Sequence, residues 1–241
     1  MIKLELIFIR HGRTAANEAR QFTGWSHTPL SLSGQAEAQE KRAALRSFLP
    51  AQGVLVSPLY RCIETARILF PEFRPIIFPE FVERGFGRFE GKNLAENSRD
   101  EEFARWLDDR QLWPGGMESD EHLVERLDTG LKRVTRLALA AAHTVDESLF
   151  NGFTTAEQRI LPLETVAALE KDLRFLVVCH GGVIGSLCRT YGKGYEDILS
   201  FPDNLEPLAF YFDLDSQTEK LSFSSIRMAE DFSNWPVEEE L

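Results

Sequence analysis

Residues 3–14 read KLELIFIRHGRT, and residues 174–182 read RFLVVCHGG. In each stretch a run of Leu, Ile, Phe and Val, typical of a buried strand, ends abruptly at a histidine followed by glycine. Strands that are buried on both faces of a parallel sheet have such continuous apolar runs, and ligands gather at the carboxyl ends of these strands. We therefore expect His11 and His180 to lie at one edge of a sheet, beside a ligand.

Strands and helices alternate along the rest of the chain. We expect strands over residues 3–9, 53–56, 74–78 and 174–179, helices over 33–49, 59–70, 118–143 and 183–191, and a hairpin over 208–214 and 221–226. The helix over 33–49 would begin with Ser33 as its N-cap and end before Pro50. This alternation predicts an α/β fold: a three-layer α/β/α sandwich with a mostly parallel, mixed sheet, formed by residues 1–241 as a single domain.

One connection is longer than the connections between a helix and a strand usually are. About thirty residues, 144–173, separate the expected long helix from the strand that precedes His180. We expect an insertion here, which is either a flap over the ligand site or a surface excursion without a role. The flap would comprise residues 144–162 and would contribute Phe150 or Phe153 to substrate specificity.

The composition excludes several classes of partner. The chain has 27 Lys and Arg against 38 Asp and Glu, and this net charge of −11 argues against general binding of nucleic acid or of an anionic membrane surface. The longest aliphatic run, 137–142, is too short to span a membrane, and Lys3, Glu5 and Arg10 interrupt the apolar start that a signal peptide needs. The three cysteines lack metal-ligand spacing and suggest reduced thiols, so we expect a cytoplasmic protein. No pattern in the sequence fixes an oligomeric state.

The polar residues at the expected sheet edge suit a phosphoryl group. Arg10 precedes His11, and Arg61 begins the helix that follows the strand over 53–56, so two guanidinium groups would join two imidazoles. Arginine binds phosphate oxygens in a bidentate manner and keeps its charge, while a neutral imidazole is a competent nucleophile toward phosphorus. Such a set can transfer a phosphoryl group without a metal. Taken alone, Arg61 would instead be expected on the solvent face of its helix.

Two further features fit this chemistry. Glu83 is the best candidate for the proton donor to a leaving alkoxide, because it follows a strand and a short apolar segment, where burial would raise its pKa. As an isolated residue it would otherwise be expected at the surface. Gly181 and Gly182 open the helix after His180, and the N-terminus of that helix can face an anion, so we expect Gly181 to contact the substrate.

An ordered set of motifs runs from residue 10 to about residue 190. It comprises Arg10-His11-Gly12-Arg13-Thr14, Asn17, Ser57-Pro58-Leu59-Tyr60-Arg61, Glu83, Phe86-Gly87, Glu90-Gly91 and His180-Gly181-Gly182. This set strongly resembles the histidine phosphatase superfamily, in the branch that includes the cofactor-dependent phosphoglycerate mutases and many small-molecule phosphatases. The resemblance implies a phosphoglycerate mutase-like fold, with His11 as the phosphorylated nucleophile and Arg10, Arg61 and His180 as a clamp on the phosphoryl group. It also implies Glu83 as the proton donor and Asn17 with Thr14 as supporting contacts near the phosphate; no metal or other cofactor is expected.

Within that superfamily the sequence favours a phosphatase. Phe22-Thr23-Gly24-Trp25 resembles the substrate loop of the mutases, which implies substrate contacts from Thr23 and Gly24. However, Glu83 is followed by Arg84-Gly85-Phe86-Gly87 where the mutases have a sequence of the Arg-His-Tyr-Gly type, and residues 113–119, WPGGMES, resemble a segment common in the phosphatases. We expect a phosphomonoesterase that acts on a small phosphorylated metabolite through a phosphohistidine. The alternatives are a cofactor-dependent phosphoglycerate mutase and a catalytically silent protein that binds a phosphorylated ligand or another protein.

Other phosphatase chemistries do not fit the sequence. Asp213 and Asp215 form an Asp-x-Asp pair like that of the haloacid dehalogenases, but they lie at an expected hairpin turn, and Gln217 stands where a Thr or Val is needed. No cysteine is followed, after five intervening residues, by the arginine that a cysteine phosphatase requires. The remaining histidines are isolated from one another rather than clustered as metal ligands: His27, His122 and His143.

Overall fold

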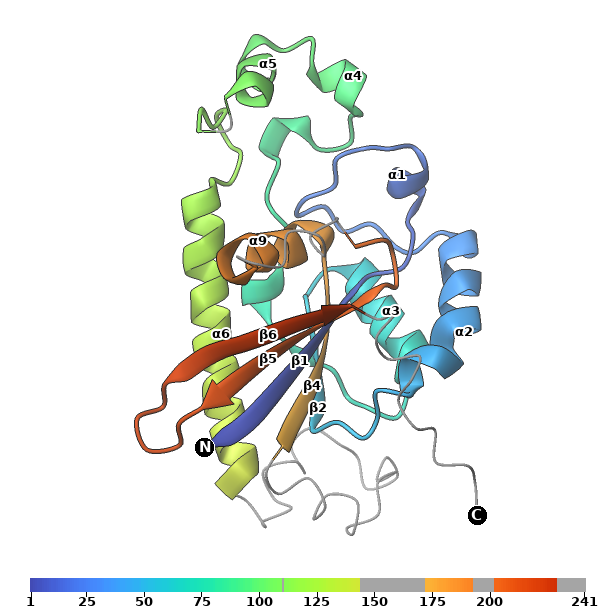
Figure 1. The fold of residues 1–241 in the computed structure, drawn as a ribbon. Coiled ribbons are helices and arrows are strands. Elements are labelled where there is room, and N and C mark those ends of the chain that lie inside the picture. The colour runs from blue at the N-terminus through green and yellow to red at the C-terminus, as the bar shows by residue number, and fades with distance from the viewer. Residues whose placement is uncertain (110, 144–171, 193–201, 229–241) are drawn as a thin grey trace.

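A computed structural model describes residues 1–109, 111–143, 172–192 and 202–228 (Figure 1). Within these ranges, one sheet has the strand order β3-β2-β4-β1-β5-β6. The strands are β1 (Ile2–Arg10), β2 (Gly53–Val56), β3 (Ile76–Ile77), β4 (Asp172–Cys179), β5 (Pro207–Leu214) and β6 (Leu221–Met228). The first four are parallel to one another, whereas β5 pairs antiparallel with β1 and β6 antiparallel with β5. The expected mostly parallel, mixed sheet is confirmed.

Helices cover both faces of the sheet, as expected for a three-layer sandwich (Figure 1). On one face, α6 (Asp120–His143) and α9 (Gly181–Tyr191) pack against Leu4, Leu6 and Phe8 of β1. On the other face, α2 (Leu32–Arg46) and α3 (Tyr60–Leu69) pack against Ile7 and Ile9 of the same strand. Successive side chains of a strand point to opposite faces. Both faces of β1 are therefore buried, which explains its continuous apolar run.

Smaller elements lie beyond the carboxyl ends of the parallel strands (Figure 1). They are α1 (Ala15–Glu18), a 3₁₀ turn at Gly87–Phe89, α4 (Leu94–Asn97) and α5 (Glu101–Asp108). Another 3₁₀ turn, Pro79–Phe81, packs instead into the core beside α6 and β1. A separate apolar cluster of Phe89, Phe103, Trp106 and Met117 holds part of this region together. The small elements therefore have their own packing and can present loops toward the sheet edge.

The start of α2 differs from the sequence-based expectation. Ser31, not Ser33, is the N-cap: its hydroxyl accepts a hydrogen bond from the Gly34 amide at 3.1 Å. Ser33 lies inside the first turn, where its hydroxyl donates to the Glu18 carboxylate. The loop after β1 holds Ser31 in this position, because the Ser31 amide donates to the Arg13 carbonyl oxygen at 2.9 Å.

Several other boundaries also differ from the expectation. The third strand comprises only Ile76–Ile77, and α2 ends at Arg46, well before Pro50. Because β4 begins at Asp172, the last two residues of the expected insertion over 144–173 belong to the sheet. The rest of that insertion, including the expected flap with Phe150 and Phe153, lies outside the described residues.

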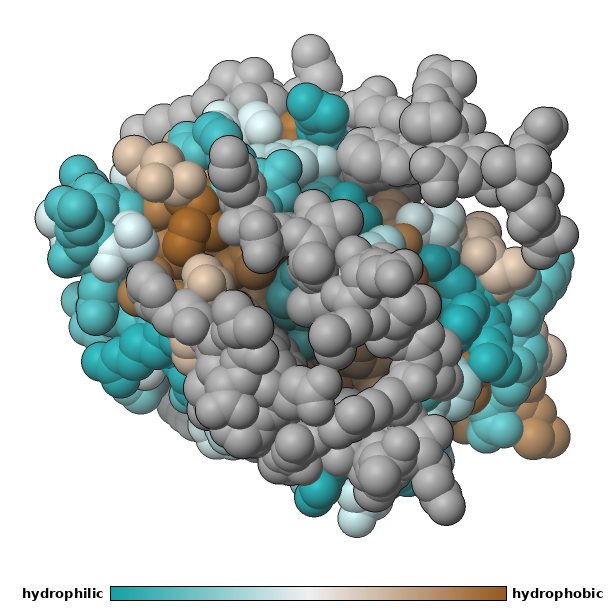
Figure 2. Space-filling view, turned by 90° about the horizontal axis from the view of Figure 1, so that it is seen from below, coloured by the Kyte–Doolittle hydropathy of each residue, from teal (hydrophilic) through white to brown (hydrophobic). Residues whose placement is uncertain are grey.

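Seen from below, the described surface is largely hydrophilic, with smaller areas of apolar residues between (Figure 2). None of the helices in the described ranges combines the length and the apolar character that a bilayer crossing requires.

Substitution of Phe8 tests the packing of the central strand. The Phe8 side chain is fully buried, and its ring meets the rings of Phe81 and Phe210 edge-on, with centroids 5.8 Å and 5.3 Å away. We expect Phe8→Ala to lower the free energy of unfolding by about 3–5 kcal/mol, measured by urea denaturation. Leu32→Ala, at a side chain that is 85% exposed, should change it by less than about 0.5 kcal/mol. Equal effects of the two substitutions would contradict this assignment of the core.

Candidate active site

The two histidines that follow β1 and β4 lie next to each other. The His11 amide donates to the Cys179 carbonyl oxygen at 3.0 Å, which extends the pairing of β1 with β4 beyond the end of β1. His180 directly follows β4, and the centroids of the two imidazole rings are 5.2 Å apart. Both side chains are buried. The parallel pairing of the two strands therefore brings both imidazoles to one edge of the sheet.

Hydrogen bonds fix the tautomer of His11. Arg61 Nε lies 3.2 Å from His11 Nε2, and because a guanidinium N–H can only donate, His11 Nε2 accepts with its lone pair. The ring proton must then be on Nδ1, which lies 2.8 Å from the Gly12 carbonyl oxygen and donates to it. Gly12 is held in turn by Thr65, whose hydroxyl group accepts a hydrogen bond from the Gly12 amide at 2.9 Å.

The charge state of His11 follows from its surroundings. Burial, reinforced by the positive charge of Arg61, holds the pKa of His11 well below its usual value. The imidazole is therefore neutral at physiological pH. It presents an unprotonated Nε2 beside a guanidinium, which is the form that a nucleophile requires.

Arg61 is fully buried, so the alternative that it lies on the solvent face of its helix is wrong. Its Nη1 donates to the Ser26 carbonyl oxygen and its Nη2 to the Gly24 carbonyl oxygen, both at 2.8 Å. These bonds attach the loop of residues 24–28 to α3. Neutral oxygens thus hold the guanidinium next to His11, and no described carboxylate pairs with it directly. Burial lowers its pKa, although the charges of Glu83 and Glu90 act to raise it.

Arg10 carries an unsatisfied donor at the same edge. Its Nη1 donates to the Pro202 carbonyl oxygen at 2.8 Å, but its Nε is buried and has no hydrogen-bond partner among the described residues. A buried N–H without a partner costs free energy, and native proteins contain few of them. A phosphoryl oxygen would satisfy such a donor.

His180 faces the first turn of α3. Its Nε2 lies 2.7 Å from Ser57 Oγ and 3.5 Å from Cys62 Sγ. Burial, with the charge of Arg61 as the next contribution, holds the pKa of His180 well below its usual value. Burial also raises the pKa of the Cys62 thiol to about 12, so that thiol stays protonated. The contacts of His180 with Ser57 and Cys62 were not predicted, because they depend on the pairing of β2 with β4, which places Ser57 and the start of α3 beside the end of β4.

Glu83 lies at the N-terminus of α9, and the alternative that it is a surface residue is wrong. Its Oε1 accepts from the Arg84 amide at 2.7 Å and its Oε2 from the Gly182 amide at 3.1 Å. Burial raises the pKa of Glu83, although these two amides and the charges of Arg61 and Arg10 act in the opposite direction. The carboxyl group is thus arranged to hold a proton at higher pH than an exposed glutamate.

The remaining expected substrate contacts lie at the starts of α1 and α9 and on the loop that follows α1. Thr14 and Asn17 form a capping box at α1, with the Thr14 amide 3.1 Å from Asn17 Oδ1 and the Asn17 amide 3.2 Å from Thr14 Oγ1. Thr23 is half-buried next to Gly24, which is buried, and Gly181 is the buried first residue of α9. A Cβ at Gly24 would lie 2.4 Å from the Arg84 carbonyl oxygen, so only glycine fits there.

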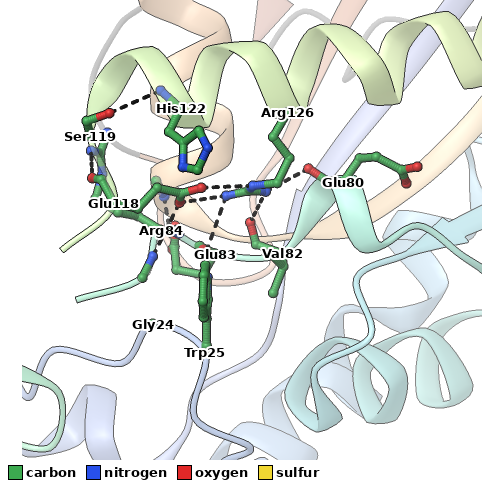
Figure 3. A network of polar contacts seen from close by, with 12 residues as sticks. Gly24, Trp25, Glu80, Val82, Glu83, Arg84, Glu118, Ser119, His122 and Arg126 are labelled. Atoms are coloured by element: carbon green, nitrogen blue, oxygen red, sulfur yellow. Dashed lines mark hydrogen bonds and ion pairs between the residues drawn. The ribbon is translucent and has the colours of Figure 1, made fainter. Parts of the chain in front are cut away.

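Glu90 and Trp25 connect the 24–28 loop to the segment that carries Glu83. Glu90 Oε1 accepts from the Trp25 amide at 3.0 Å and from the Phe86 amide at 3.2 Å. The Trp25 indole N–H donates to the Glu83 carbonyl oxygen at 2.8 Å (Figure 3). Neither contact could be predicted from the sequence, because each joins segments that are far apart in the chain.

The described residues contain no group of three or more His, Cys, Asp and Glu side chains that could together bind a metal ion. The polar groups that meet at the sheet edge are instead two arginines, two neutral histidines and one carboxyl group with a raised pKa. This set can bind a dianion, attack it with a nitrogen lone pair and protonate a departing oxygen.

Comparison with known proteins identifies related sequences and structures. The family model "Histidine phosphatase superfamily (branch 1)" matches residues 6–145. A 2,3-bisphosphoglycerate-dependent phosphoglycerate mutase of Neisseria meningitidis is 29% identical over 229 residues, covering 87% of this chain and 95% of the relative. The mutase of the same name from Streptococcus thermophilus is 25% identical over 221 residues, covering 87% of this chain and 94% of the relative.

Two solved structures have the same fold. The α-ribazole phosphatase of Shigella flexneri aligns with a TM-score of 0.63 and 21% identity, covering 93% of this chain and 96% of that one. A mycobacterial glucosyl-3-phosphoglycerate phosphatase aligns with a TM-score of 0.64 and 21% identity, covering 94% of this chain and 98% of that one.

Gly182→Ala tests the placement of the Glu83 carboxyl group. A Cβ at residue 182 would lie 2.2 Å from Glu83 Oε1, so the carboxyl group must move away from α9. We expect the pKa of Glu83 to shift down toward its ordinary value, because relief of burial, the largest cause of the raised pKa, outweighs the loss of the Gly182 amide hydrogen bond, which acts to lower it. NMR titration of the ¹³C-labelled carboxyl group measures the shift. Gly115→Ala is the control, because a Cβ there meets no atom within 4 Å. An unchanged Glu83 titration in Gly182→Ala would contradict the described contact.

Proposed function

The chain belongs to the histidine phosphatase superfamily (branch 1), and on that premise we propose that it is a phosphoric monoester hydrolase that forms a phosphohistidine at His11. Its substrate would be a small phosphorylated metabolite. The observation that carries this proposal is the neutral, buried His11 imidazole, whose Nε2 lone pair lies 3.2 Å from Arg61 Nε. The guanidinium attracts the oxygens of a phosphoryl group, and this places the phosphorus atom next to the nitrogen lone pair that attacks it.

In the first step, Arg61 Nε exchanges its hydrogen bond to His11 Nε2 for one to a phosphoryl oxygen, and the freed Nε2 lone pair attacks the phosphorus atom of the substrate. The N–P bond forms as the bond between phosphorus and the leaving oxygen breaks, and Glu83 gives its proton to that oxygen. Arg61, Arg10 and His180 would together bind the phosphoryl oxygens, and the unsatisfied Nε of Arg10 would be one of the donors. The raised pKa of Glu83 supports its role as the acid, because the proton must be present when the alcohol departs.

In the second step, water attacks the phosphohistidine. Glu83, now a carboxylate, accepts a proton from the water as its oxygen bonds to phosphorus, and the N–P bond breaks. His11 Nε2 regains its lone pair, inorganic phosphate leaves, and Glu83 is protonated for the next cycle. No metal takes part in either proposed step.

The ion pairs beyond the sheet edge favour hydrolysis over mutase activity. Phosphoglycerate carries a carboxylate besides its phosphate, so a mutase needs further free cations. Arg84 is held by the Glu118 carbonyl oxygen at 2.7 Å and by Asp120, and Arg88 lies 3.0 Å from Asp100 and 2.9 Å from Glu102. These two arginines are therefore already compensated, which supports a substrate with one phosphoryl group as its main anionic part.

A cofactor-dependent phosphoglycerate mutase is the second candidate. It is favoured by the curated relatives, which carry that name at 29% identity. The solved structures named as phosphatases of α-ribazole and of glucosyl-3-phosphoglycerate support hydrolysis instead.

The three cysteines are free and buried, which fits the reducing cytoplasm that we propose as the location of this protein.

Phosphate release from a panel of phosphorylated metabolites, with a chelator present, tests the proposed activity. We expect the wild-type protein to release phosphate without added metal, and His11→Ala to abolish release while circular dichroism shows an intact fold. A parallel isomerase assay uses 3-phosphoglycerate with 2,3-bisphosphoglycerate. Isomerisation with little release would identify the mutase, and His11→Ala activity within a few-fold of wild type would refute the nucleophile.

The pH dependence of kcat/KM tests the role of Glu83. Because burial raises its pKa, Glu83 stays protonated to higher pH than an exposed glutamate, and kcat/KM for an alkyl phosphate should fall as pH rises through that pKa. Glu83→Gln should lower kcat/KM by about 10²–10⁴-fold, and its residual rate should lack this alkaline decrease. Ionisation of the substrate is the same for both proteins, so it cancels in the comparison. An alkaline decrease that persists in Glu83→Gln would show that another group is the acid.

A further inference from the structure

Arg126 reaches from α6 to the backbone on which Glu83 stands (Figure 3). Its Nη1 donates to the carbonyl oxygens of Glu80 and Val82, at 2.7 Å and 2.8 Å, and its Nη2 lies 3.5 Å from the Glu83 carbonyl oxygen. One guanidinium thus contacts three carbonyl groups over four residues of chain. A guanidinium has five donors in a planar fork and can do this while it also binds a carboxylate, whereas an ammonium group has three donors on one nitrogen atom.

Glu118 holds Arg126 from the other side and also contacts the segment just after Glu83 (Figure 3). Arg126 Nε donates to Glu118 Oε1 at 3.0 Å and Arg126 Nη2 to Glu118 Oε2 at 2.8 Å. Glu118 Oε2 lies 3.3 Å from the Gly85 amide, and the Glu118 amide donates to the Gly85 carbonyl oxygen at 2.8 Å. The pair therefore contacts the backbone on both sides of Glu83.

The Glu83 side chain depends on this backbone for its position. Residues 82–86 belong to neither a helix nor a strand, so regular hydrogen bonding does not hold them. The hydrogen bonds described for the Glu83 carboxyl group come from the Arg84 and Gly182 amides. A displacement of the 82–85 backbone would therefore move the carboxyl group directly relative to α9 and His11.

We infer that Arg126 and Glu118 are positioning residues for the proton donor, Glu83. Arg126 holds the backbone that precedes Glu83, by its hydrogen bond to the Val82 carbonyl oxygen. Glu118 holds both Arg126 and the Gly85 amide. Neither side chain needs to touch the substrate. The inference rests on the proposed function, since it assigns the pair to the step in which Glu83 protonates the leaving oxygen.

The attraction between the two charges alone does not account for this arrangement. A buried ion pair contributes little net stability, because the cost of removing both charges from water offsets their attraction. The Glu118 and Arg126 side chains are only 5% and 19% exposed. A pair of apolar side chains would fill the same volume, but it would leave the carbonyl oxygens of residues 80, 82 and 83 without these donors and the 82–85 backbone without its fixed position.

Leaving-group dependence separates positioning from simple stabilisation. An alkyl phosphate has a poor leaving group and needs the acid, whereas an activated aryl phosphate needs it much less. We expect Arg126→Lys, which keeps the charge but not the fork, to lower kcat/KM about tenfold or more for the alkyl ester and less than about threefold for the aryl ester. Added to Glu83→Gln, it should lower kcat/KM for the alkyl ester by less than about a further threefold, because both changes act on one group.

Arg133→Lys is the matched control on the same helix. Arg133 Nη1 pairs with the Glu80 carboxylate at 3.0 Å and Nη2 donates to the Ile77 carbonyl oxygen at 3.1 Å, so it holds the same stretch of chain farther from Glu83. It should change the rates for both esters by the same factor. Equal losses on the two esters in Arg126→Lys, or the selective loss in Arg133→Lys, would overturn the positioning role.

Glu118→Gln provides a second variant if Arg126→Lys fails to fold, since it keeps the size of the side chain. It should show the same selective loss on the alkyl ester, and uniform loss would overturn the inference. Failure of the proposed function is separable from this result. If Glu83→Gln itself treats the two esters alike, the assignment of the acid is wrong; if Glu83→Gln is selective and Arg126→Lys and Glu118→Gln are not, only the positioning role is wrong.

Discussion

Arg61 brings a full positive charge into the protein interior at the edge of the sheet, where its side chain has no exposed surface. A buried charge is costly unless hydrogen bonds compensate for lost water. Here the carbonyl oxygens of Gly24 and Ser26 and the lone pair of His11 Nε2 receive its donors. The same contacts fix the 24–28 loop, set the His11 tautomer and help to keep His11 and His180 neutral. One buried guanidinium thus prepares both the nucleophile and the place where an anion would bind.

The position of Glu83 depends on elements that are far apart in the sequence. Its carboxyl group accepts a hydrogen bond from the first turn of α9, its carbonyl group from the Trp25 indole, and its flanking backbone from Arg126 of α6. Burial then raises its pKa, whereas Arg61 and Arg10 attract the charged form. The two groups therefore have opposite requirements: the His11 nucleophile must stay free of a proton at Nε2, whereas the Glu83 acid must retain its proton. The charges of Arg61 and Arg10 act on the pKa of both groups.

The sequence predicted the fold and the meeting of the two histidines because both depend on local patterns. Continuous apolar runs that end at His11 and His180 identify buried parallel strands, and the carboxyl ends of such strands meet. The sequence did not predict the contacts of Thr65, Glu90 or the Arg126–Glu118 pair. Each joins segments that are well separated in the chain, and a charged residue on a helix is more often exposed. The predicted N-cap of α2 was wrong by two residues, because a hydrogen bond from the Ser31 amide to the Arg13 carbonyl oxygen, which joins two separate segments, holds Ser31 at the start of the helix.

The account depends on a covalent bond between phosphorus and one nitrogen atom of one residue. Rapid quenching during turnover of an aryl phosphate, followed by mass spectrometry of peptides and NMR of the intact phosphoprotein, tests this directly. The tautomer fixed by the Gly12 carbonyl group and by Arg61 predicts an acid-labile phosphoryl group on Nε2 of His11. A phosphoryl group on Nδ1 or on another residue, or steady turnover that proceeds without a phosphoenzyme, would contradict it.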